Sequence, residues 1–380
     1  MVRDQPIAIG ISGTGFIARQ LVRALLRTTD LAIASVLTRR EINSVADFPL
    51  PQRLTNSIEQ FLDRSELIVE CTGDPRHATE VVAAALIRQR PVVTMNSEFH
   101  VACGSYFADR GYLTEAEGDQ PGSLAALAQD CMAMGFKPMV YGSMKRYLDL
   151  DPPPDAMSYW AQHLGFTLEQ VTSFTDGTKL QTEQALVANG LGAVMYKPGM
   201  LGLPGSDRIT AQTQLGHFAS EIGSPIADYI IDRHLPPGVF VTGLHDDAER
   251  ETLRAYNLGD GPFYVLERPF HLCGLEVVKT IRRVLREEPP LLNNSPNPVV
   301  SVAAVAKRDL PAGYRIDRGM GGFDLRGEAV VAAERRGHLP IGVVFDAVLN
   351  NSVSAGEMLC WSDVELPETM AVQIARKIFP

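Results

Sequence analysis

The sequence predicts an α/β protein that begins with a doubly wound parallel sheet and continues into two further domains. Three observations support this. An apolar run at residues 7–11 precedes a glycine-containing turn and then apolar residues at helical spacing, which is the pattern of a βα unit. Strand and helix patterns go on alternating to about residue 145. The chain has 380 residues, too many for one ordinary domain core.

Composition and charge are those of a globular protein. Hydrophobic residues make up 45% of the chain, and its net charge is -10 without a concentrated basic patch, so we expect no nucleic-acid partner. Five cysteines without metal-type spacing indicate free thiols in a reducing compartment. Neither a signal-peptide pattern nor a membrane-length apolar run is found. We therefore expect a cytoplasmic protein, with no membrane association, that acts on a small molecule. A homo-oligomer is expected because such assemblies are common.

The turn after the first strand predicts a dinucleotide site. Residues 13–18 have the sequence GTGFIA, a G-x-G-x-x-A pattern. The first glycine permits the tight turn, the second lets the backbone approach a pyrophosphate, and the alanine lets the helix pack on its strand. The N–H groups at the helix start can bind the anion. We predict that the cofactor contacts Gly13, Thr14, Gly15, Phe16 and Ile17.

The ends of later strands indicate which nicotinamide cofactor is bound. Where an acid would hold the ribose of NAD, this chain has Arg39 and Arg40, and guanidinium groups suit the 2′-phosphate of NADP. The alternative is that these arginines are solvated loop residues. Thr72, Gly73 and Asn96 follow two other strands of the predicted sheet, so we expect them to line the cofactor path.

A second candidate site lies in residues 173–190, SFTDGTKLQTEQALVANG, which we expect to be a strand end followed by a helix. Asp176 or Thr178 could simply cap this helix, Thr178 through a capping box with Gln181. Lys179 is harder to explain, because a lysine in the first turn opposes the helix dipole. Glu183 lies one turn later on the same face. We expect Lys179 to act on substrate, with a pKa lowered by burial.

Residues 113–130 form the other polar stretch. Glu115, Glu117, Asp119 and Gln120 precede a helix, so they could serve as acid and base or as helix caps. Three of them, Glu115, Glu117 and Asp119, are candidate metal ligands. Lys145 follows a strand end and is an alternative catalytic lysine.

The expected domains are a dinucleotide-binding domain at 1–145, a substrate domain at 146–298 and a small β domain at 299–380. Helix 271–286 is expected to pack back on the first domain, and the stretch 286–300 to be a linker. His271, at the start of that helix, is treated as a packing or capping residue. The last domain shows short strands and turns without a catalytic constellation.

Taken together, the motifs resemble those of homoserine-dehydrogenase-like oxidoreductases carrying a C-terminal β-clip module of the SAF type. The matching segments are GTGFIA, GDQPG, FTDGTK, FHLCGLEV and AKRDLPAG. The combination is similar to 1-deoxy-D-xylulose 5-phosphate reductoisomerase-like enzymes. That resemblance implies NADPH and a divalent metal ion, Mg²⁺ or Mn²⁺, acting on a sugar phosphate. It also implies a site that contains Asp119, Gln120, Lys145, Asp176 and Lys179, with one of the two lysines as proton donor.

We therefore predict an NADP(H)-dependent oxidoreductase that acts on a carbonyl or alcohol. A sugar phosphate is the first substrate class, and a homoserine-type aldehyde is the second. An NADP-binding regulator, or a carbohydrate-binding protein without turnover, is the alternative of another class.

Overall fold

The amino-terminal domain is a six-stranded parallel sheet of the predicted type. The computed structural model describes residues 5–380. The strands run in the order β3-β2-β1-β4-β5-β6, which is the order of a dinucleotide-binding fold. Their bounds are β1 (Ile7–Ser12), β2 (Leu31–Leu37), β3 (Leu54–Thr55), β4 (Leu67–Glu70), β5 (Val92–Thr94) and β6 (Leu113–Glu115). The prediction of a doubly wound sheet is confirmed.

Helices cover both faces of this sheet because its strands are apolar on both sides. On one face lie α1 (Phe16–Leu25) and α11 (Cys273–Leu285), so the later helix does pack on the first domain. The other face carries α2 (Ile58–Asp63), α3 (Pro75–Ile87) and α4 (Ser97–Cys103), together with the C-terminal helix α12 (Met370–Ile378).

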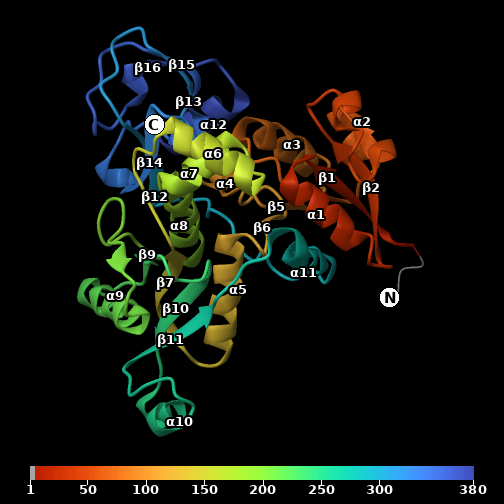
Figure 1. The fold of residues 1–380 in the computed structure, drawn as a ribbon. Helices are drawn as coiled ribbons and strands as arrows, with labels where there is room; N and C mark the ends of the chain where they lie inside the picture. The colour runs from red at the N-terminus through yellow and green to blue at the C-terminus, as the bar shows by residue number, and fades with distance from the viewer. Residues whose placement is uncertain (1–4) are drawn as a thin grey trace.

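The second domain is built on a five-stranded mixed sheet in the order β11-β10-β7-β9-β8. Its strands are β7 (Lys137–Lys145), β8 (Leu203–Pro204), β9 (Ile226–Ile231), β10 (Val239–Leu244) and β11 (Phe263–Arg268). The helices α5 (Gln120–Ala133) and α8 (Thr178–Leu191) pack on one face, and α9 (Arg208–Ile222) on the other. Between β10 and β11 an arm carrying α10 (Arg250–Ala255) projects from the molecule (Figure 1).

The expected boundary at residue 145 is wrong, because β7 pairs with β9 and β10 and not with the first sheet. The expected strand before α8 is also wrong. Those residues form α6 (Pro154–Leu164) and α7 (Leu168–Thr175), a helical hairpin that joins α8 through Gly177 at φ +81°. Gln181 bonds the backbone of Gly199 and Ala329 instead of closing a capping box with Thr178.

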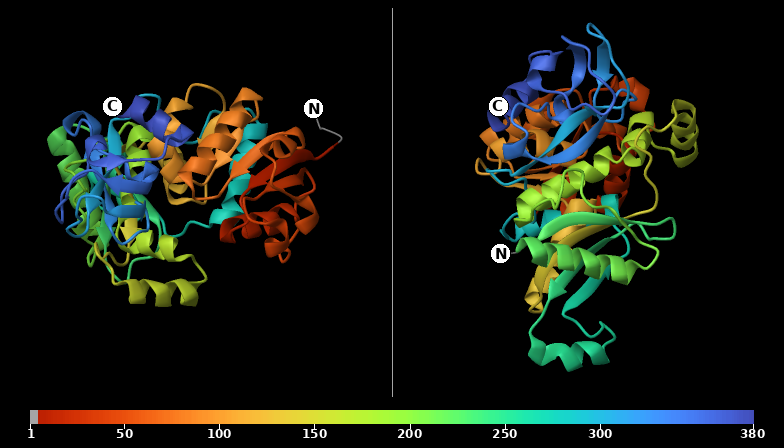
Figure 2. Two further views of the ribbon diagram at one scale, coloured as in Figure 1. Left: turned by 90° about the horizontal axis from the view of Figure 1, so that it is seen from above. Right: turned by 90° about the vertical axis from the view of Figure 1, so that its left-hand side faces the viewer.

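The C-terminal residues add a small β domain that shares its core with the second domain. Its strands are β12 (Val300–Ala306), β13 (Arg315–Arg318), β14 (Leu325–Val331), β15 (Phe345–Leu349) and β16 (Val364–Glu365). Side chains of β12 and β14 lie in one apolar cluster with those of α5 and α8. The views in Figure 2 show this domain against both neighbours. It therefore completes the core of the second domain and is not a separate unit joined only by a linker.

The stretch expected to be a linker is in fact a buried connection. Leu291 and Leu292 run beside β6, where Leu292 accepts a hydrogen bond from Glu115 N at 2.7 Å. Asn294 is fully buried and donates to Ser105 of the first domain, while Asn189 of α8 donates to Asn294. This chain of amides links all three parts of the molecule.

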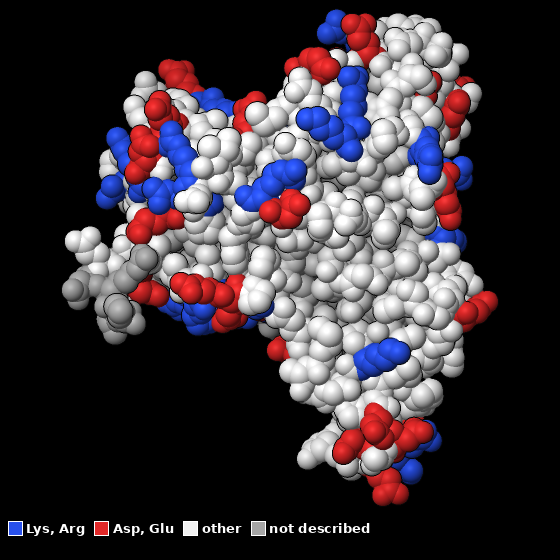
Figure 3. Space-filling view, turned by 180° about the vertical axis from the view of Figure 1, so that it is seen from behind, with Lys and Arg blue, Asp and Glu red and all other residues white. Residues whose placement is uncertain are grey.

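Charged side chains of both signs are interspersed over the surface in Figure 3, with acidic residues gathered at the tip of the arm. The segment between β10 and β11 contains Asp246, Asp247, Glu249, Glu251 and Asp260. Within residues 5–380, every helix falls short of the length and apolarity that crossing a membrane requires.

A buried ion pair fastens the β domain to the start of α8. Asp176 Oδ2 lies 2.8 Å from Lys307 Nζ, and both side chains are buried. Removing one partner of such a pair leaves an uncompensated charge, so we predict that Asp176→Asn lowers the free energy of unfolding by about 3–5 kcal/mol. Urea unfolding measures this.

The matched control is Asp346→Asn. Its carboxylate lies 3.6 Å from Arg76 and is 58% exposed, so its loss should cost under about 1 kcal/mol. Equal decreases in the free energy of unfolding of the two variants would contradict the prediction. The double variant Asp176→Asn/Lys307→Met should lose less than the sum of its single variants, because it leaves no unpaired charge.

Candidate active site

The glycine turn has the geometry that a dinucleotide requires. Gly13 has φ +122°, and a side chain there would lie 3.2 Å from the carbonyl oxygen of Cys71. Gly15 is the N-cap of α1, and a Cβ atom there would meet no atom within 4 Å. The helix start carries no side-chain cap, so its N–H groups face open space. A pyrophosphate can approach this backbone as predicted.

An aromatic contact brings the second domain to this turn. Phe16, which follows Gly15, is 48% exposed, and Phe166 meets it edge to face with ring centroids 5.3 Å apart. Phe166 lies between α6 and α7 and also contacts Phe174 at 5.8 Å. The helical hairpin therefore lies beside the predicted pyrophosphate site.

Arg39 and Arg40 lie at the end of β2, as the sequence predicted, and both are exposed. Arg39 pairs with Asp74 at 2.8 Å, and Asp74 in turn caps α3. Thr14 of the glycine turn meets Thr38 at 3.3 Å between the hydroxyl oxygens. The two arginines thus lie next to the turn, with one of them already neutralised in part by a carboxylate.

Thr72 and Asn96 lie at the adjoining ends of β4 and β5, where Glu70 organises the backbone. Glu70 is fully buried and accepts hydrogen bonds from Thr72 N and from the hydroxyl groups of Thr72 and Thr94. Burial raises the pKa of Glu70 to about 7, although these donors act to lower it. Gly73 follows at φ +68° with open space around it.

Lys179 lies where the two domains meet. Its Nζ donates to Ser97 Oγ at 2.8 Å and to Glu98 at 3.1 Å, both at the start of α4. Asp119 and Glu183 lie 3.9 and 4.0 Å away. Burial alone would lower the pKa of Lys179, but the surrounding carboxylates raise it above its ordinary value. The expectation of a lowered pKa is therefore wrong, because the sequence did not reveal how many acids surround this amine.

Lys145 joins the same cluster from the end of β7. Its Nζ lies 3.5 Å from Glu183 Oε2, whose other oxygen faces Lys179. Burial raises the pKa of Glu183, and the two lysines act against that rise. His271 is near enough to Glu183 to act in the same direction, and its Nδ1 lies 3.3 Å from Gly118 O. The structure thus brings Lys145, Lys179, Glu183 and Asp119 together, and the family resemblance had placed both lysines and Asp119 in one site.

Asp176 is not part of this cluster. Its carboxylate binds Lys307 and Thr178 N, on the side of α8 that the β domain covers. Gly327 N donates to the Thr178 hydroxyl on the same side. The structure therefore places Asp176 apart from the lysine cluster, although the family resemblance implied that it belongs to the site. Gln120, at the first position of α5, is buried, and neither atom of its amide has a hydrogen-bond partner among residues 5–380.

The predicted metal candidates do not assemble into a metal site. Glu117 pairs with Arg268 at 2.8 Å and with Lys279 at 2.6 Å, which turns it away from Asp119 and Glu115. Glu115 lies instead next to His100, Nε2 to Oε2 3.3 Å. Over residues 5–380, no group of three or more His, Cys, Asp or Glu side chains could hold a metal ion.

Several members of the cluster were missed in the sequence. Ser97, Glu98 and His100 of α4 were not among the predicted site residues, and His271 was treated as a packing or capping residue. The one available signal was the place of Ser97 and Glu98 just after a strand end of the parallel sheet, where ligands bind.

Comparison with protein families agrees with this geometry. Residues 13–104 match the model of the homoserine dehydrogenase NAD-binding domain, and residues 118–277 match that of the catalytic domain of oxidoreductase DRL. The chain is an NAD(P)-dependent oxidoreductase. The resemblance to homoserine dehydrogenases is thereby confirmed for the nucleotide-binding domain. The second match begins at Gly118, which agrees with the observation that the oxidoreductase's second domain includes α5 and β7.

The oxidoreductase also resembles several solved structures. One is a probable dehydrogenase from Thermotoga maritima, with 14% identity, 76% of this chain and 91% of that chain covered, and a TM-score of 0.45. Another is homoserine dehydrogenase from S. aureus, with 12% identity, 74% and 75% coverage, and a TM-score of 0.38. Similarity at this level does not indicate a substrate. No curated protein matches the chain.

The buried Glu70 predicts a pH-dependent stability. The unfolded chain loses this proton near its ordinary value of 4.5, while the folded protein keeps it to about pH 7. The contribution of Glu70 to the free energy of unfolding is therefore fully present below pH 4.5, and it is lost as the pH rises toward 7. The difference in unfolding free energy between Glu70→Gln and wild type should shift in favour of the variant by at most about 3 kcal/mol over that range.

Urea unfolding at several pH values measures this difference. The control is Glu59→Gln on the exposed face of α2, whose difference from wild type should not change with pH. A constant difference for Glu70→Gln would contradict the assignment.

Proposed function

We propose that the protein transfers a hydride between NADP(H) and a carbon of a small hydroxy or carbonyl compound, with Lys145 carrying the proton. The observation that carries this proposal is the pairing of Lys145 with Glu183, beside Lys179, at the carboxyl end of the nucleotide-binding sheet. When bound, the nicotinamide ring supplies or accepts the hydride.

Lys145 suits proton transfer better than Lys179 because its ammonium group has unused donors. An ammonium has three N–H groups, and those of Lys179 are engaged by Ser97 and Glu98 with two more carboxylates close by. Within the described residues 5–380, Lys145 Nζ has a single polar contact, with Glu183 at 3.5 Å, and its side chain is 24% exposed. A substrate oxygen can therefore bind Lys145 Nζ without displacing another partner.

The other residues of the cluster would orient the substrate and hold the charge of the site. Glu183 accepts from Lys145 and can receive a proton from it, because burial already raises the pKa of this carboxyl. Gln120 supplies an amide whose atoms lack hydrogen-bond partners among residues 5–380, which suits it to a substrate hydroxyl group, and Asp119 adds a carboxylate whose Oδ2 lies 3.9 Å from Lys179. Lys179 acts through its position, fixing Glu98 and the start of α4 against α8.

The charge of the cluster favours a substrate that is uncharged at the reacting carbon. Two lysines, Lys145 and Lys179, face three carboxylates, of Glu98, Asp119 and Glu183, so formal charges of +2 and -3 sum to -1. A phosphate dianion would be repelled there. The finer expectation of a metal-dependent sugar-phosphate reductoisomerase gains no support from these residues.

For the cofactor, we propose NADP(H) in preference to NAD(H). Gly13, Gly15 and the start of α1 would hold the pyrophosphate, and the exposed guanidinium groups of Arg39 and Arg40 would bind the 2′-phosphate. Asp74 opposes this preference because it neutralises part of the charge of Arg39.

The proton-transfer role predicts a loss of turnover without a loss of cofactor binding. Lys145→Met keeps the aliphatic length and removes the proton, so kcat should fall by about 10²- to 10⁴-fold while the Kd for NADPH stays unchanged. Carbonyl-dependent NADPH oxidation and fluorescence titration measure the two quantities.

The matched control is Lys137→Met at the exposed opposite end of β7, which should keep full activity. Full turnover of Lys145→Met would refute the assignment of the proton donor. If no carbonyl compound supports NADPH oxidation by the wild type while NADPH still binds, the alternative of a nucleotide-binding regulator is favoured.

Cofactor preference is tested by two variants that are expected to change the affinity for NADPH in opposite directions. Arg39→Ala should weaken NADPH binding by about tenfold and leave NADH binding unchanged, because a charge-assisted contact to the 2′-phosphate is lost. Asp74→Asn keeps a helix cap and frees Arg39, so it should strengthen NADPH binding. Tighter NADH than NADPH binding by the wild type would contradict the proposal.

A further inference from the structure

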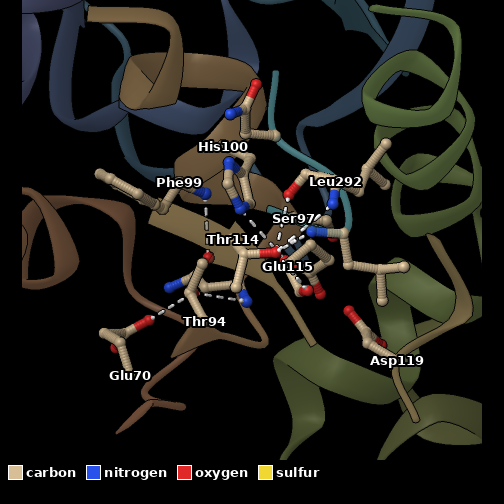
Figure 4. A network of polar contacts seen from close by, with 12 residues as sticks. Glu70, Thr94, Ser97, Phe99, His100, Thr114, Glu115, Asp119 and Leu292 are labelled. Carbon is tan, nitrogen blue, oxygen red and sulfur yellow. Dashed lines mark hydrogen bonds and ion pairs between the residues drawn. The ribbon is translucent and has the colours of Figure 1, made fainter. Parts of the chain in front are cut away.

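A buried pair of ionisable residues lies directly behind the lysine cluster. Glu115 ends β6, His100 lies on α4, and neither side chain is exposed to solvent. Figure 4 shows the His100 ring directed at the Glu115 carboxyl group, with Asp119 on the side away from Glu70. His100 Nε2 and Glu115 Oε2 are 3.3 Å apart, but the contact lacks hydrogen-bond geometry.

The groups that face Glu115 come from every neighbouring element. Asp119 at the start of α5 and Glu98 on α4 repel a negative charge there, and Lys179 on α8 attracts one. Burial and Asp119 raise the pKa of Glu115 well above its ordinary value. Burial lowers the pKa of His100 to about 3, so the imidazole is neutral and does not offset an anion.

The polar side-chain atoms of Glu115 and His100, and one oxygen of the neighbouring Asp119, have no hydrogen-bond partner among residues 5–380. Asp119 Oδ2 is buried without a hydrogen-bond partner among residues 5–380, and Lys179 Nζ is 3.9 Å away. A buried carboxylate oxygen in this state is costly unless an O–H or N–H group reaches it. A protonated carboxyl group has such an O–H, and an ionised one has none.

We propose that Glu115 is a positioning residue, held as the neutral carboxylic acid, whose O–H fixes the Asp119 carboxylate toward Lys179. The inference rests on the proposed function only for its effect on turnover. With Glu115 neutral, three carboxylates face the two lysines, and Asp119 keeps one orientation. An ionised Glu115 would add a fourth negative charge and leave Asp119 without its donor.

Two variants of Glu115 test whether its side chain is a neutral acid or an ionised carboxylate. Glu115→Gln has the shape of the protonated side chain and an N–H donor, so kcat should stay within about threefold of wild type. Glu115→Ala removes the donor and should lower kcat by about 10- to 100-fold, with the Kd for NADPH unchanged. The pH profile of kcat should be the same for Glu115→Gln and wild type. A loss of activity in folded Glu115→Gln equal to that of Glu115→Ala would overturn the proposal.

Infrared spectroscopy tests the protonation state without using activity. At about pH 8 the wild type should show the absorption of a protonated carboxyl group, and Glu115→Gln should lack it. Glu70→Gln is the control, since Glu70 is ionised at that pH and its removal should leave the band in place. Absence of the band in the wild type would overturn the proposal. This measurement decides the matter even if the wild type turns over no carbonyl compound, a result that would refute the proposed function alone.

Discussion

The Lys179 ammonium group is the contact on which the arrangement of the site depends. It joins α8 of the second domain to Ser97 and Glu98 of the nucleotide-binding domain, and it faces Asp119 and Glu183. An ammonium enclosed by carboxylates stays charged, because their attraction outweighs the cost of burial. Lys179 thus joins the nucleotide-binding domain to the second domain, and in the proposed function Lys145 beside it keeps donors for a substrate oxygen.

The rest of the fold holds α8 in place for this contact. On the opposite side, the β domain binds the start of the helix through Asp176 with Lys307 and through Gly327 N with Thr178. At its other end, Asn189 accepts from Val299 N and Val300 N. The β domain therefore acts on the site through α8 without contributing a residue to it. Removing residues 299–380 would expose the shared core, so a truncated chain is a poor test of what this domain does.

What could be predicted from the sequence was local. The glycine turn could be predicted because its pattern occupies six consecutive residues. Lys179 could be singled out because a lysine in the first turn of a helix opposes the helix dipole. Asp176 was misjudged because its partner, Lys307, lies in another domain and leaves no mark near it. The strand β7 was assigned to the wrong sheet, since an apolar strand pattern does not tell which strands it pairs with. Ser97 and Glu98 were missed because their role depends on a helix that follows much later in the chain.

The most direct test of the account is a crystal structure of the protein with NADP⁺ bound. Hydride transfer through a small substrate requires the nicotinamide C4 atom to lie about 4–6 Å from the nearest lysine Nζ of the cluster. We expect C4 at that distance from Lys145 Nζ, with the pyrophosphate over Gly15 and Lys179 still bound to Glu98. A nicotinamide ring directed away from the cluster, with Lys145 and Glu183 facing only solvent, would contradict the account.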